Sequence, residues 1–314
     1  MVPSVLCDQP GNRWVAAIDL GGSVVKGTLA AADRLDYPVR RMPRTSNRPI
    51  ADLLHALSAL MSEAESARRS IISVGVAVPG IVDETAGYVR RAVNLGIENL
   101  NLRALLEQEL GVPIFVGHDI RCAATAEQSV NDASFTQSTM MVPIGTGIGA
   151  ALIVDGRPLI ADGYAGEIGH LNVGSERTCA CGLTGCLETV SSAKAISRIY
   201  EELSGEVGLD ATVIATRASG SDQAAMQAWN GAINGLVIAL EASCSILGLD
   251  SIIIAGGLSL AGPYLINPLR DALYHRLSFH RQPQLSTAKL TADAGCRGAA
   301  LGALSVAGSG AGVS

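Results

Sequence analysis

Residues 14–31, WVAAIDLGGSVVKGTLAA, decide how this chain folds. An apolar run ends at Asp19, two glycines follow, and a second apolar run comes after them. This order predicts a strand, a tight turn and a second strand that pairs with the first. Backbone N–H groups in such a glycine turn can cradle phosphate oxygens, because no Cβ blocks their approach. An ordinary hairpin with a solvated aspartate is the simpler alternative.

Apolar strands alternate with amphipathic helices along the rest of the chain, which implies α/β layering. The opening hairpin makes the sheet mixed rather than wholly parallel. Strands are expected within 72–83, 112–119, 140–159 (a pair around a Gly-Thr-Gly turn), 251–257 and 289–295. Helices are expected within 50–69, 102–110, 191–247, 264–276 and 298–308, and another begins after residue 119.

Two strand-rich blocks, 14–119 and 140–295, predict two α/β domains with a hinge near residue 120. Both blocks run an apolar strand into a glycine turn, which hints at an old duplication. The predicted divisions are an N-terminal tail (1–13), an N-terminal domain (14–119) joined by the C-terminal helix (298–314), and a C-terminal domain (120–297) containing the loop 166–188.

Composition narrows the classes of function. Apolar residues make up 48% of the chain and charged residues 17%, which favours a buried core over disorder. The net charge is −6 and no run of Lys and Arg reaches five residues, so no nucleic-acid partner is expected. Glu241 and Asp250 interrupt the apolar stretch 232–260, so no membrane span is expected. The first residues lack a signal-peptide pattern, and a cytoplasmic location is expected.

The loop 166–188, GEIGHLNVGSERTCACGLTGCLE, carries a dense set of metal ligands. Three cysteines and one histidine are the complement of a closed, four-coordinate zinc site, which predicts a structural rather than a catalytic ion. Glu167 and Glu188 flank the set and suggest a polar pocket shaped by the metal. A surface loop with free thiols is the alternative. The predicted ligands are His170, Cys179, Cys181 and Cys186.

Four further cysteines, Cys7, Cys122, Cys244 and Cys296, are scattered along the chain. An odd number of cysteines without a secretion signal argues against a disulfide framework. We expect these four to be buried or incidental thiols.

Two more glycine turns follow apolar strands, and a phosphate could bind to either. Each is weak by itself, but turns at the carboxyl ends of strands collect where ligands bind in α/β sheets. They comprise Gly145, Thr146 and Gly147, and then Gly256 and Gly257.

Asp119 ends the apolar segment VPIFVGH. A carboxylate there is suited to accept a proton from a hydroxyl that attacks phosphorus. A helix N-cap is the structural alternative, and the two roles are compatible.

Six segments of the chain resemble, in this order, the ROK family of sugar kinases and sugar-responsive repressors. They are AAIDLGGSVVKG, GVAVPGIVD, NLGIENLNLRALLEQELGVPIFVGHD, VPIGTGIGAALIVDG, GEIGH and CACGLTGCLE. The resemblance covers about residues 14–308. It implies the actin-like ATPase (ribonuclease H-like) fold, with two α/β domains and a cleft between them.

The resemblance also implies roles for single residues. Asp119 matches the catalytic base, and His170 matches both a zinc ligand and a sugar contact. The other matched sugar contacts are Gly80, Asn94, Glu167 and Glu188. The matched phosphate and adenosine motifs contain Asp19, Gly21, Gly22, Ser23, Thr146, Gly147, Gly256 and Gly257. Lys26 and Gly145 are added as expected nucleotide contacts, because Lys26 could reach a phosphate and Gly145 belongs to the second glycine turn.

One departure from the family pattern adjoins the base. The family usually has Asn-Asp, with the Asn on a sugar hydroxyl, where this chain has His118-Asp119. Arg121 and Cys122 likewise stand where small residues are usual. An imidazole is larger than an amide and differs in its donors, so the identity of the sugar stays open.

The expected function is therefore transfer of the ATP γ-phosphoryl group to the 6-hydroxyl of a hexose, with glucose first. ATP, Mg²⁺ and a structural Zn²⁺ are the expected cofactors, and a homodimer is the expected assembly. N-acetylmannosamine or another hexose is an alternative acceptor. A non-catalytic sugar-binding regulator is a further alternative, although the first phosphate motif begins near residue 16 and leaves no room for a preceding helix-turn-helix domain.

Overall fold

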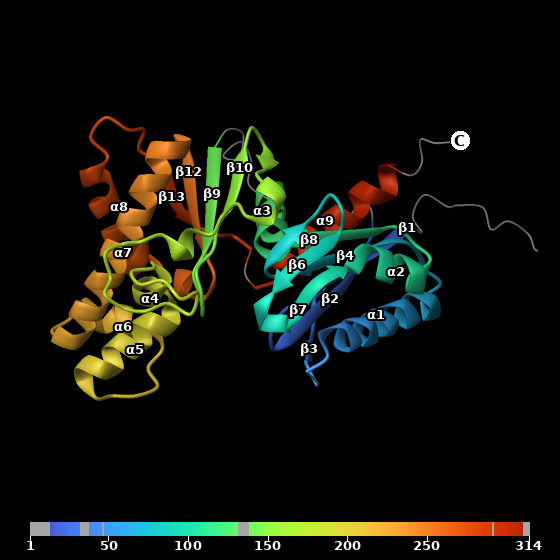
Figure 1. Ribbon diagram of the computed structural model, residues 1–314, viewed down its shortest axis with the longest axis horizontal. Coiled ribbons are helices and arrows are strands. Elements are labelled where there is room, and N and C mark those ends of the chain that lie inside the picture. The colour runs from blue at the N-terminus through green and yellow to red at the C-terminus, as the bar shows by residue number, and fades with distance from the viewer. Residues whose placement is uncertain (1–12, 32–37, 46, 131–137, 291, 310–314) are drawn as a thin grey trace, which may run out of the picture. The chain divides into compact units, whose positions relative to one another are not determined.

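The computed structural model describes residues 13–31, 38–45, 47–130, 138–290 and 292–309 (Figure 1). Residues 1–12 of the predicted tail, with Cys7, and residues 310–314 of the predicted last helix lie outside these ranges. The described residues form two compact units. The first draws on Met1–Ala126, Ile160–Tyr164 and Asp293–Ser314, and the second on Glu127–Leu159 and Ala165–Ala292.

The first unit is built on a mixed sheet with the strand order β3-β2-β1-β4-β8. The predicted strand-turn-strand is confirmed, because β1 and β2 pair antiparallel around the glycine turn. Strands β4 and β8 run parallel to β1, so their carboxyl ends share one edge with the glycine turn. The strands are β1 (Arg13–Leu20), β2 (Val24–Ala31), β3 (Arg40–Pro43), β4 (Ser70–Val78) and β8 (Ile114–His118).

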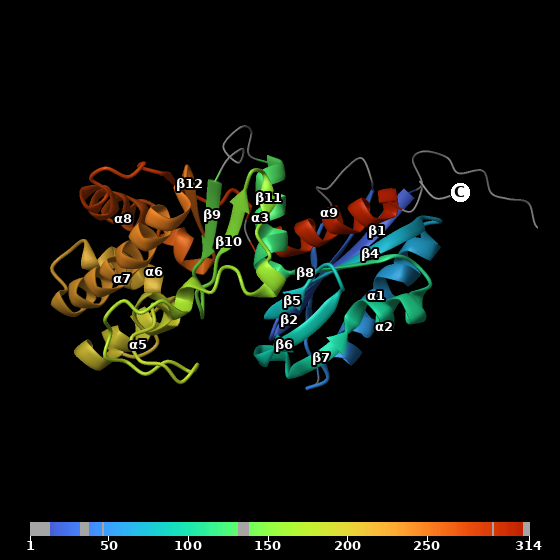
Figure 2. The same ribbon diagram turned by 45° about the horizontal axis from the view of Figure 1, so that its top comes forward.

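Helices cover both faces of this sheet. On one face lies α1 (Pro49–Ser66), whose buried leucines Leu53, Leu57 and Leu60 recur at helical spacing. On the other face lies α9 (Ala294–Ser309), which packs on β1, β4 and β8 (Figure 2). Small residues permit this close approach: a Cβ on Gly75 of β4 would collide with the carbonyl group of Ala299.

A small antiparallel sheet, β5 (Ile81–Asp83), β6 (Tyr88–Ala92) and β7 (Ile97–Asn101), follows β4. The short 3₁₀ turn Val93–Leu95 joins β6 to β7. Helix α2 (Leu102–Leu110) then begins on an Asn101 side-chain cap and ends at Gly111, which has φ 66°. A glycine suits this C-cap position, because a left-handed conformation costs glycine little.

The second unit repeats the plan of the first. Its sheet has the order β11-β10-β9-β12-β13, again with an opening antiparallel hairpin and parallel strands beyond it. The glycine turns after β1 and β9 thus occupy equivalent places, as an old duplication would leave them. The strands are β9 (Ser138–Pro143), β10 (Ala151–Val154), β11 (Arg157–Pro158), β12 (Ser251–Ala255) and β13 (Gln284–Thr287).

Helix α7 (Gln223–Leu247) is the centre of the helical layer in this unit. It is long and apolar enough to cross a membrane, but half of its most apolar window is buried inside the fold. Core helices pass the same test of length and composition. The helices that pack on it are α4 (Glu188–Ser191), α5 (Ala193–Ser204), α6 (Ala211–Ala218) and α8 (Pro263–Arg276).

The predicted last strand at 289–295 is wrong. The strand that pairs with β12 is Gln284–Thr287, and α9 begins at Ala294. The amides of Lys289 and Leu290 donate instead to the buried Glu127 carboxylate, at 2.5 and 2.8 Å. Glu127 lies on α3 (Asp119–Val130), so this segment is held by a side chain rather than by a neighbouring strand.

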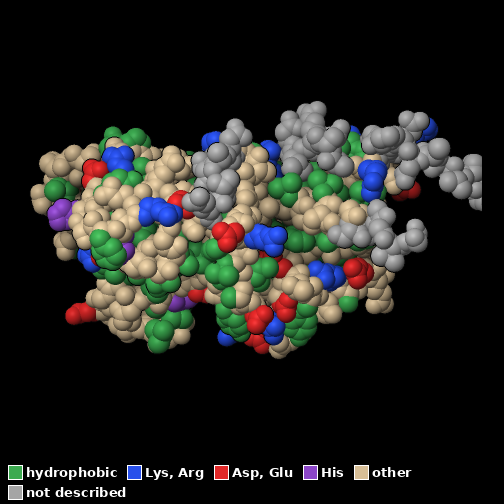
Figure 3. Space-filling view, turned by 90° about the horizontal axis from the view of Figure 1, so that it is seen from above, with side chains coloured by type: hydrophobic (Ala, Val, Ile, Leu, Met, Phe, Trp, Pro, Cys, Tyr) green, Lys and Arg blue, Asp and Glu red, His purple; other side chains and the backbone are tan. Residues whose placement is uncertain are grey.

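Charged side chains are mixed on the face shown in Figure 3. Lys and Arg side chains lie singly there, among acidic and uncharged ones. Of the scattered cysteines, Cys122, Cys244 and Cys296 are free and buried. Burial raises the pKa of the Cys244 thiol to about 11, so it stays neutral at physiological pH.

Candidate functional site

The first glycine turn joins β1 to β2 and places a carboxylate at its start. Asp19 is 8% exposed, and its Oδ2 accepts a hydrogen bond from Lys26 Nζ at 2.9 Å. Burial raises the pKa of Asp19, and the Lys26 cation opposes that shift. The Gly21 amide donates to the Val24 carbonyl oxygen at 3.1 Å, which closes the turn. Lys26 is therefore paired with Asp19, next to the predicted phosphate amides.

A cavity of about 470 Å³ opens beside this turn in the first unit. It brings the predicted phosphate residues Gly22 and Ser23 together with the predicted sugar-side residue Asn94. Arg44 also lines it and donates from Nη1 to the Gly22 carbonyl oxygen at 2.8 Å. The other lining residues are Asn47, Leu95 and Gly96. Sequence patterns did not single out Arg44 or Asn47, since neither belongs to a recognisable motif.

Gly80 lies at the turn between β4 and β5, at the same edge of the sheet. Its φ is 102°, and a Cβ there would collide with the Arg91 carbonyl oxygen of β6. The position therefore requires glycine for two separate reasons. Gly80 holds the small sheet against the end of β4.

Asp119 lies where β8 ends, and it forms the first residue of α3. Its Oδ1 accepts the Ile120 amide at 2.7 Å, so the carboxylate lies against the start of the helix. The side chain is 33% exposed. Burial raises the pKa of Asp119, whereas the Ile120 amide and the Arg121 and Lys26 cations lower it. A carboxylate of raised pKa is a stronger base than an exposed one.

The His118 ring is buried beside that carboxylate. Its Nε2 lies 3.4 Å from Asp119 Oδ1, and its backbone N–H donates to Glu84 Oε1 at 3.0 Å. Burial lowers the pKa of His118 to about 3, and the Arg121 cation adds to this shift. The imidazole is therefore neutral at physiological pH, with Nε2 facing Asp119 Oδ1.

In the second unit, two predicted nucleotide turns adjoin one another. The turn after β9 closes with the Gly145 amide donating to the Gly147 carbonyl oxygen at 3.0 Å. Gly256, at the end of β12, has φ 77°, and a Cβ there would lie 2.5 Å from the Ile144 carbonyl oxygen. Thr146 lies at the tip of the first turn, and Gly257 begins the 3₁₀ turn Gly257–Ala261.

Glu188 connects this turn to the cysteine-rich loop. It is the first residue of α4, two positions after Cys186. Its Oε2 accepts the Ile148 amide at 3.0 Å. A Cβ on Gly147 would lie 2.5 Å from the same oxygen, so glycine permits this approach. A predicted sugar contact thus also supports a predicted phosphate turn.

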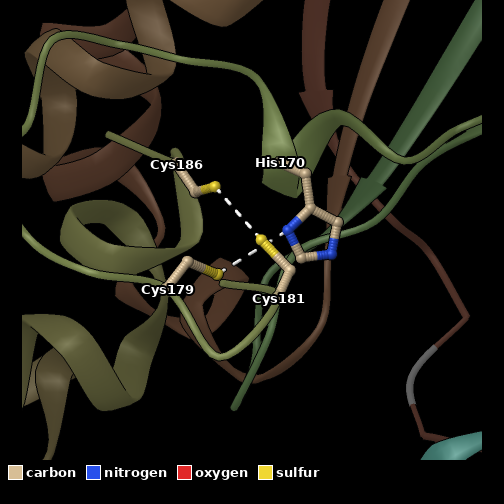
Figure 4. Close-up of side chains that lie close together, drawn as sticks. All are labelled: His170, Cys179, Cys181 and Cys186. Carbon is tan, nitrogen blue, oxygen red and sulfur yellow. Dashed lines mark hydrogen bonds between the residues drawn. The ribbon is translucent and has the colours of Figure 1, made fainter. Parts of the chain in front are cut away.

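The four predicted metal ligands converge (Figure 4). Their ligand atoms all lie within 4.8 Å of one another. Cys179 Sγ is 3.7 Å from His170 Nδ1, and Cys181 Sγ is 3.7 Å from Cys186 Sγ. A tetrahedron with metal–sulfur bonds of about 2.3 Å has edges of about 3.8 Å, so the cluster is compatible with a structural zinc ion.

The backbone of the loop explains this convergence. Gly182 and Gly185 have φ of 92° and 97° and supply the bends between the cysteines. A Cβ on Gly169 would collide with the Ile148 carbonyl oxygen, so the 3₁₀ turn Ile168–His170 lies close against the end of the β9–β10 turn. His170 directs Nδ1 to the sulfurs, which leaves Nε2 4.0 Å from Glu167 Oε2.

A cavity of about 150 Å³ lies between the cluster and the second glycine turn. Thr146, Cys179 and Glu188 all line it. The predicted acceptor loop and the predicted phosphate turn of this unit therefore face a shared space.

Gly147→Ala tests the contact between Gly147 and Glu188. The added Cβ would displace the Glu188 carboxylate or the turn, and misplacement of reacting groups by about 1 Å typically costs about 100-fold in rate. We expect turnover to fall roughly 10- to 100-fold, with no loss of bound metal. Steady-state kinetics and metal analysis of the purified variant measure this. The control is Gly231→Ala on α7, where no described atom outside the adjoining residues and the backbone of the helix lies within 4 Å of the new Cβ.

Two sheets of the same order, each opening on a hairpin with a glycine turn, define the class of this protein. It is an actin-like ATPase fold of two α/β units. The ROK family model matches residues 15–305, and the chain belongs to the ROK family.

Named relatives include kinases and regulators. The chain is 30% identical over 285 residues to a glucokinase from Halalkalibacterium halodurans, covering 83% of this chain and 85% of that protein. It is 29% identical over 291 residues to an N-acetylmannosamine kinase from Shigella flexneri, covering 91% and 97%. The crystal structure of a ROK family transcriptional regulator, a homologue of E. coli MLC, matches with a TM-score of 0.84 and 22% identity, covering 94% and 78%.

Proposed function

We propose that this protein is a hexose kinase that transfers the γ-phosphoryl group of ATP to the sugar 6-hydroxyl, with glucose as the leading acceptor. The observation that carries the proposal is the Asp119 carboxylate at the end of β8, on the sheet edge that also bears the first glycine turn. Phosphoryl transfer needs little covalent chemistry from the protein and depends on alignment and charge neutralisation.

In this proposal the first unit supplies the base and part of the phosphate site. Asp119 accepts the proton of the 6-hydroxyl as its oxygen attacks the γ-phosphorus, and the bond from phosphorus to the bridging oxygen of ADP breaks. Oδ1 is held by the Ile120 amide, so Oδ2 takes the proton. The amides of Gly21, Gly22 and Ser23 receive phosphate oxygens. Asp19 is suited to hold Mg²⁺, whose charge would offset that of the phosphates.

The second unit supplies the zinc-braced sugar contacts and the remaining nucleotide contacts. His170, with Nδ1 turned to the sulfurs, keeps Nε2 for a sugar hydroxyl, and Glu167 and Glu188 provide further acceptors. The metal's part is to fix the loop, because four protein ligands leave no open position. The turns at Gly145–Gly147 and Gly256–Gly257 are assigned to the phosphates and the adenosine.

His118 bears on which sugar is accepted. The neutral His118 ring directs its Nε2 toward Asp119, so it differs in both size and donors from an amide at that position. This difference leaves more than one hexose as a possible acceptor beside glucose. N-acetylmannosamine is the second candidate, because a kinase named for that sugar is 29% identical to this chain.

A sugar-binding regulator without catalysis is a second candidate function. The likeness to a ROK family transcriptional regulator favours it, since that protein shares this fold at a TM-score of 0.84. Such a protein would use the same acceptor contacts and would show a sugar affinity without turnover.

A sugar panel separates these functions. The purified chain is given ATP and Mg²⁺ with glucose, mannose, fructose, N-acetylglucosamine or N-acetylmannosamine, and ADP release is followed. We expect turnover on at least one sugar, with the highest kcat/KM for glucose. Binding of a sugar by calorimetry without ADP release on any of the five would favour the regulator instead.

A further inference from the structure

A buried ion pair joins α3, two residues after Asp119, to the segment that follows β5. Arg121 is 2% exposed, and its Nε donates to Glu84 Oε1 at 2.5 Å. The same Glu84 oxygen accepts the His118 amide at 3.0 Å. One carboxylate therefore holds the residues on both sides of Asp119 in the chain.

The pair also fixes α3 to the small sheet. Glu84 follows β5, and Arg121 Nη2 donates to the Val82 carbonyl oxygen at 3.3 Å. These contacts join the start of α3 to β5 in the first unit. The turn that carries Asp119 is thus restrained by hydrogen bonds from a segment more than thirty residues away in sequence.

Two polar atoms next to this pair remain available. Arg121 Nη1 and His118 Nδ1 are buried and have no hydrogen-bond partner among the described residues. The first is a donor, and the second is an acceptor when the ring carries its proton on Nε2. On its other side the neutral His118 ring presents Nε2, which lies 3.4 Å from Asp119 Oδ1.

Charges of both signs act on Asp119. The Lys26 and Arg121 cations favour its ionised form, while burial and the Asp19 carboxylate oppose it. Glu84 neutralises part of the Arg121 charge. The ionisable groups around Asp119 are Asp19 on β1, Lys26 on β2, Glu84 after β5, His118 on β8, and Arg121 and Cys122 on α3.

We propose that Glu84 and Arg121 form a positioning pair for Asp119. Glu84 fixes the turn that carries the carboxylate, and the Arg121 guanidinium supplies positive charge that favours the ionised form of the carboxylate. The inference rests on the proposed role of Asp119 as the base. Arg121 thus has a positioning function. Its place in the chain, two residues after Asp119, does not by itself indicate that function.

Opposite changes in pH dependence test the pair. In Arg121→Met the cation is lost and Glu84 stays buried without its partner, so the pKa of Asp119 should rise. The acid limb of the kcat–pH profile, where Asp119 becomes protonated, then moves to higher pH. In Glu84→Gln the guanidinium acts on Asp119 without its counter-ion, so the acid limb moves to lower pH. At a fixed pH on this limb, moving the limb by one pH unit changes the rate about tenfold. Arg121→Lys keeps the charge and should restore most of the wild-type limb.

A second readout does not need activity. Titration of ¹³C-labelled aspartate carboxyl groups, with the Asp119 signal assigned from Asp119→Asn, should show the same opposite shifts by NMR. This keeps the pair testable even if no sugar is phosphorylated, in which case only the proposed function fails. The control is Arg90→Met, which removes an exposed ion pair with Asp83 on the neighbouring sheet and should move neither limb nor signal.

Some outcomes would overturn the proposal. If the Arg121→Met and Glu84→Gln variants fold and the titration midpoint of Asp119 is the same as in the wild type, the pair is only a structural contact. If the Asp119 titration midpoint shifts in the same direction in both variants, Arg121 and Glu84 do not act on it with opposite sign, and the proposal fails. If Arg121→Met does not fold, the Glu84→Gln and Arg121→Lys titrations decide the matter.

Discussion

Asp119→Asn is expected to lower turnover about 10²- to 10⁴-fold, the usual effect of removing a positioned general base. The amide has the shape of the carboxylate and can still accept the Ile120 amide hydrogen through its oxygen. Sugar binding should therefore survive, and the loss should fall on kcat rather than on KM. Steady-state kinetics and calorimetric sugar binding measure the two quantities separately.

The matched control for this variant is Asp83→Asn. Asp83 lies in the same unit, and its side chain pairs with Arg90 at the surface. We expect its turnover to stay close to that of the wild type. Near wild-type turnover in Asp119→Asn would show that another group takes the proton, and the mechanism proposed for this chain would then be abandoned.

Loss of one of the four proposed zinc ligands is expected to have the second large effect. Cys181 is exposed, so Cys181→Ser removes a sulfur without opening the core. Structural zinc sites contribute about 10–16 kcal/mol of apparent binding free energy to small domains, so a loop built on four ligands depends on each of them. We expect less than one zinc ion per chain, faster proteolysis within 166–188 and much weaker sugar binding.

Metal analysis by mass spectrometry, limited proteolysis and calorimetry measure these three effects. Thr184→Ser is the control, because Thr184 lies on the same loop and is not among the clustered ligand atoms. If Cys181→Ser loses its zinc and still binds sugar as the wild type does, sugar recognition does not depend on the metal.

Local patterns predicted much of the fold. The β1–β2 hairpin, the end of α2 at Gly111 and the helix α8 depend on neighbouring residues, and their signals lie within the segments themselves. The cysteine-rich loop could also be predicted from the sequence, because its bends and its ligands lie within the single segment 166–188. These are features in which the sequence neighbours are also the spatial neighbours.

Long-range partners were not predictable in the same way. Residues 289–290 look like a strand, but their amides bind Glu127, more than 160 positions away. The pairing of Glu84 with Arg121 also joins distant segments, and only the unusual bulk of Arg121 beside Asp119 gave a signal. The cavity residues Arg44 and Asn47 had no signal, because tertiary packing alone brings them beside Gly22.

The identity of the phosphorylated product distinguishes a hexose kinase from every alternative function. The wild-type chain is incubated with ATP, Mg²⁺ and the best sugar of the panel, and the mixture is analysed by ³¹P NMR. We expect a sugar 6-phosphate formed in equal amount with ADP, and about 10²- to 10⁴-fold less of it with Asp119→Asn. Inorganic phosphate in place of a sugar phosphate, or no conversion of a sugar that binds, would contradict this expectation.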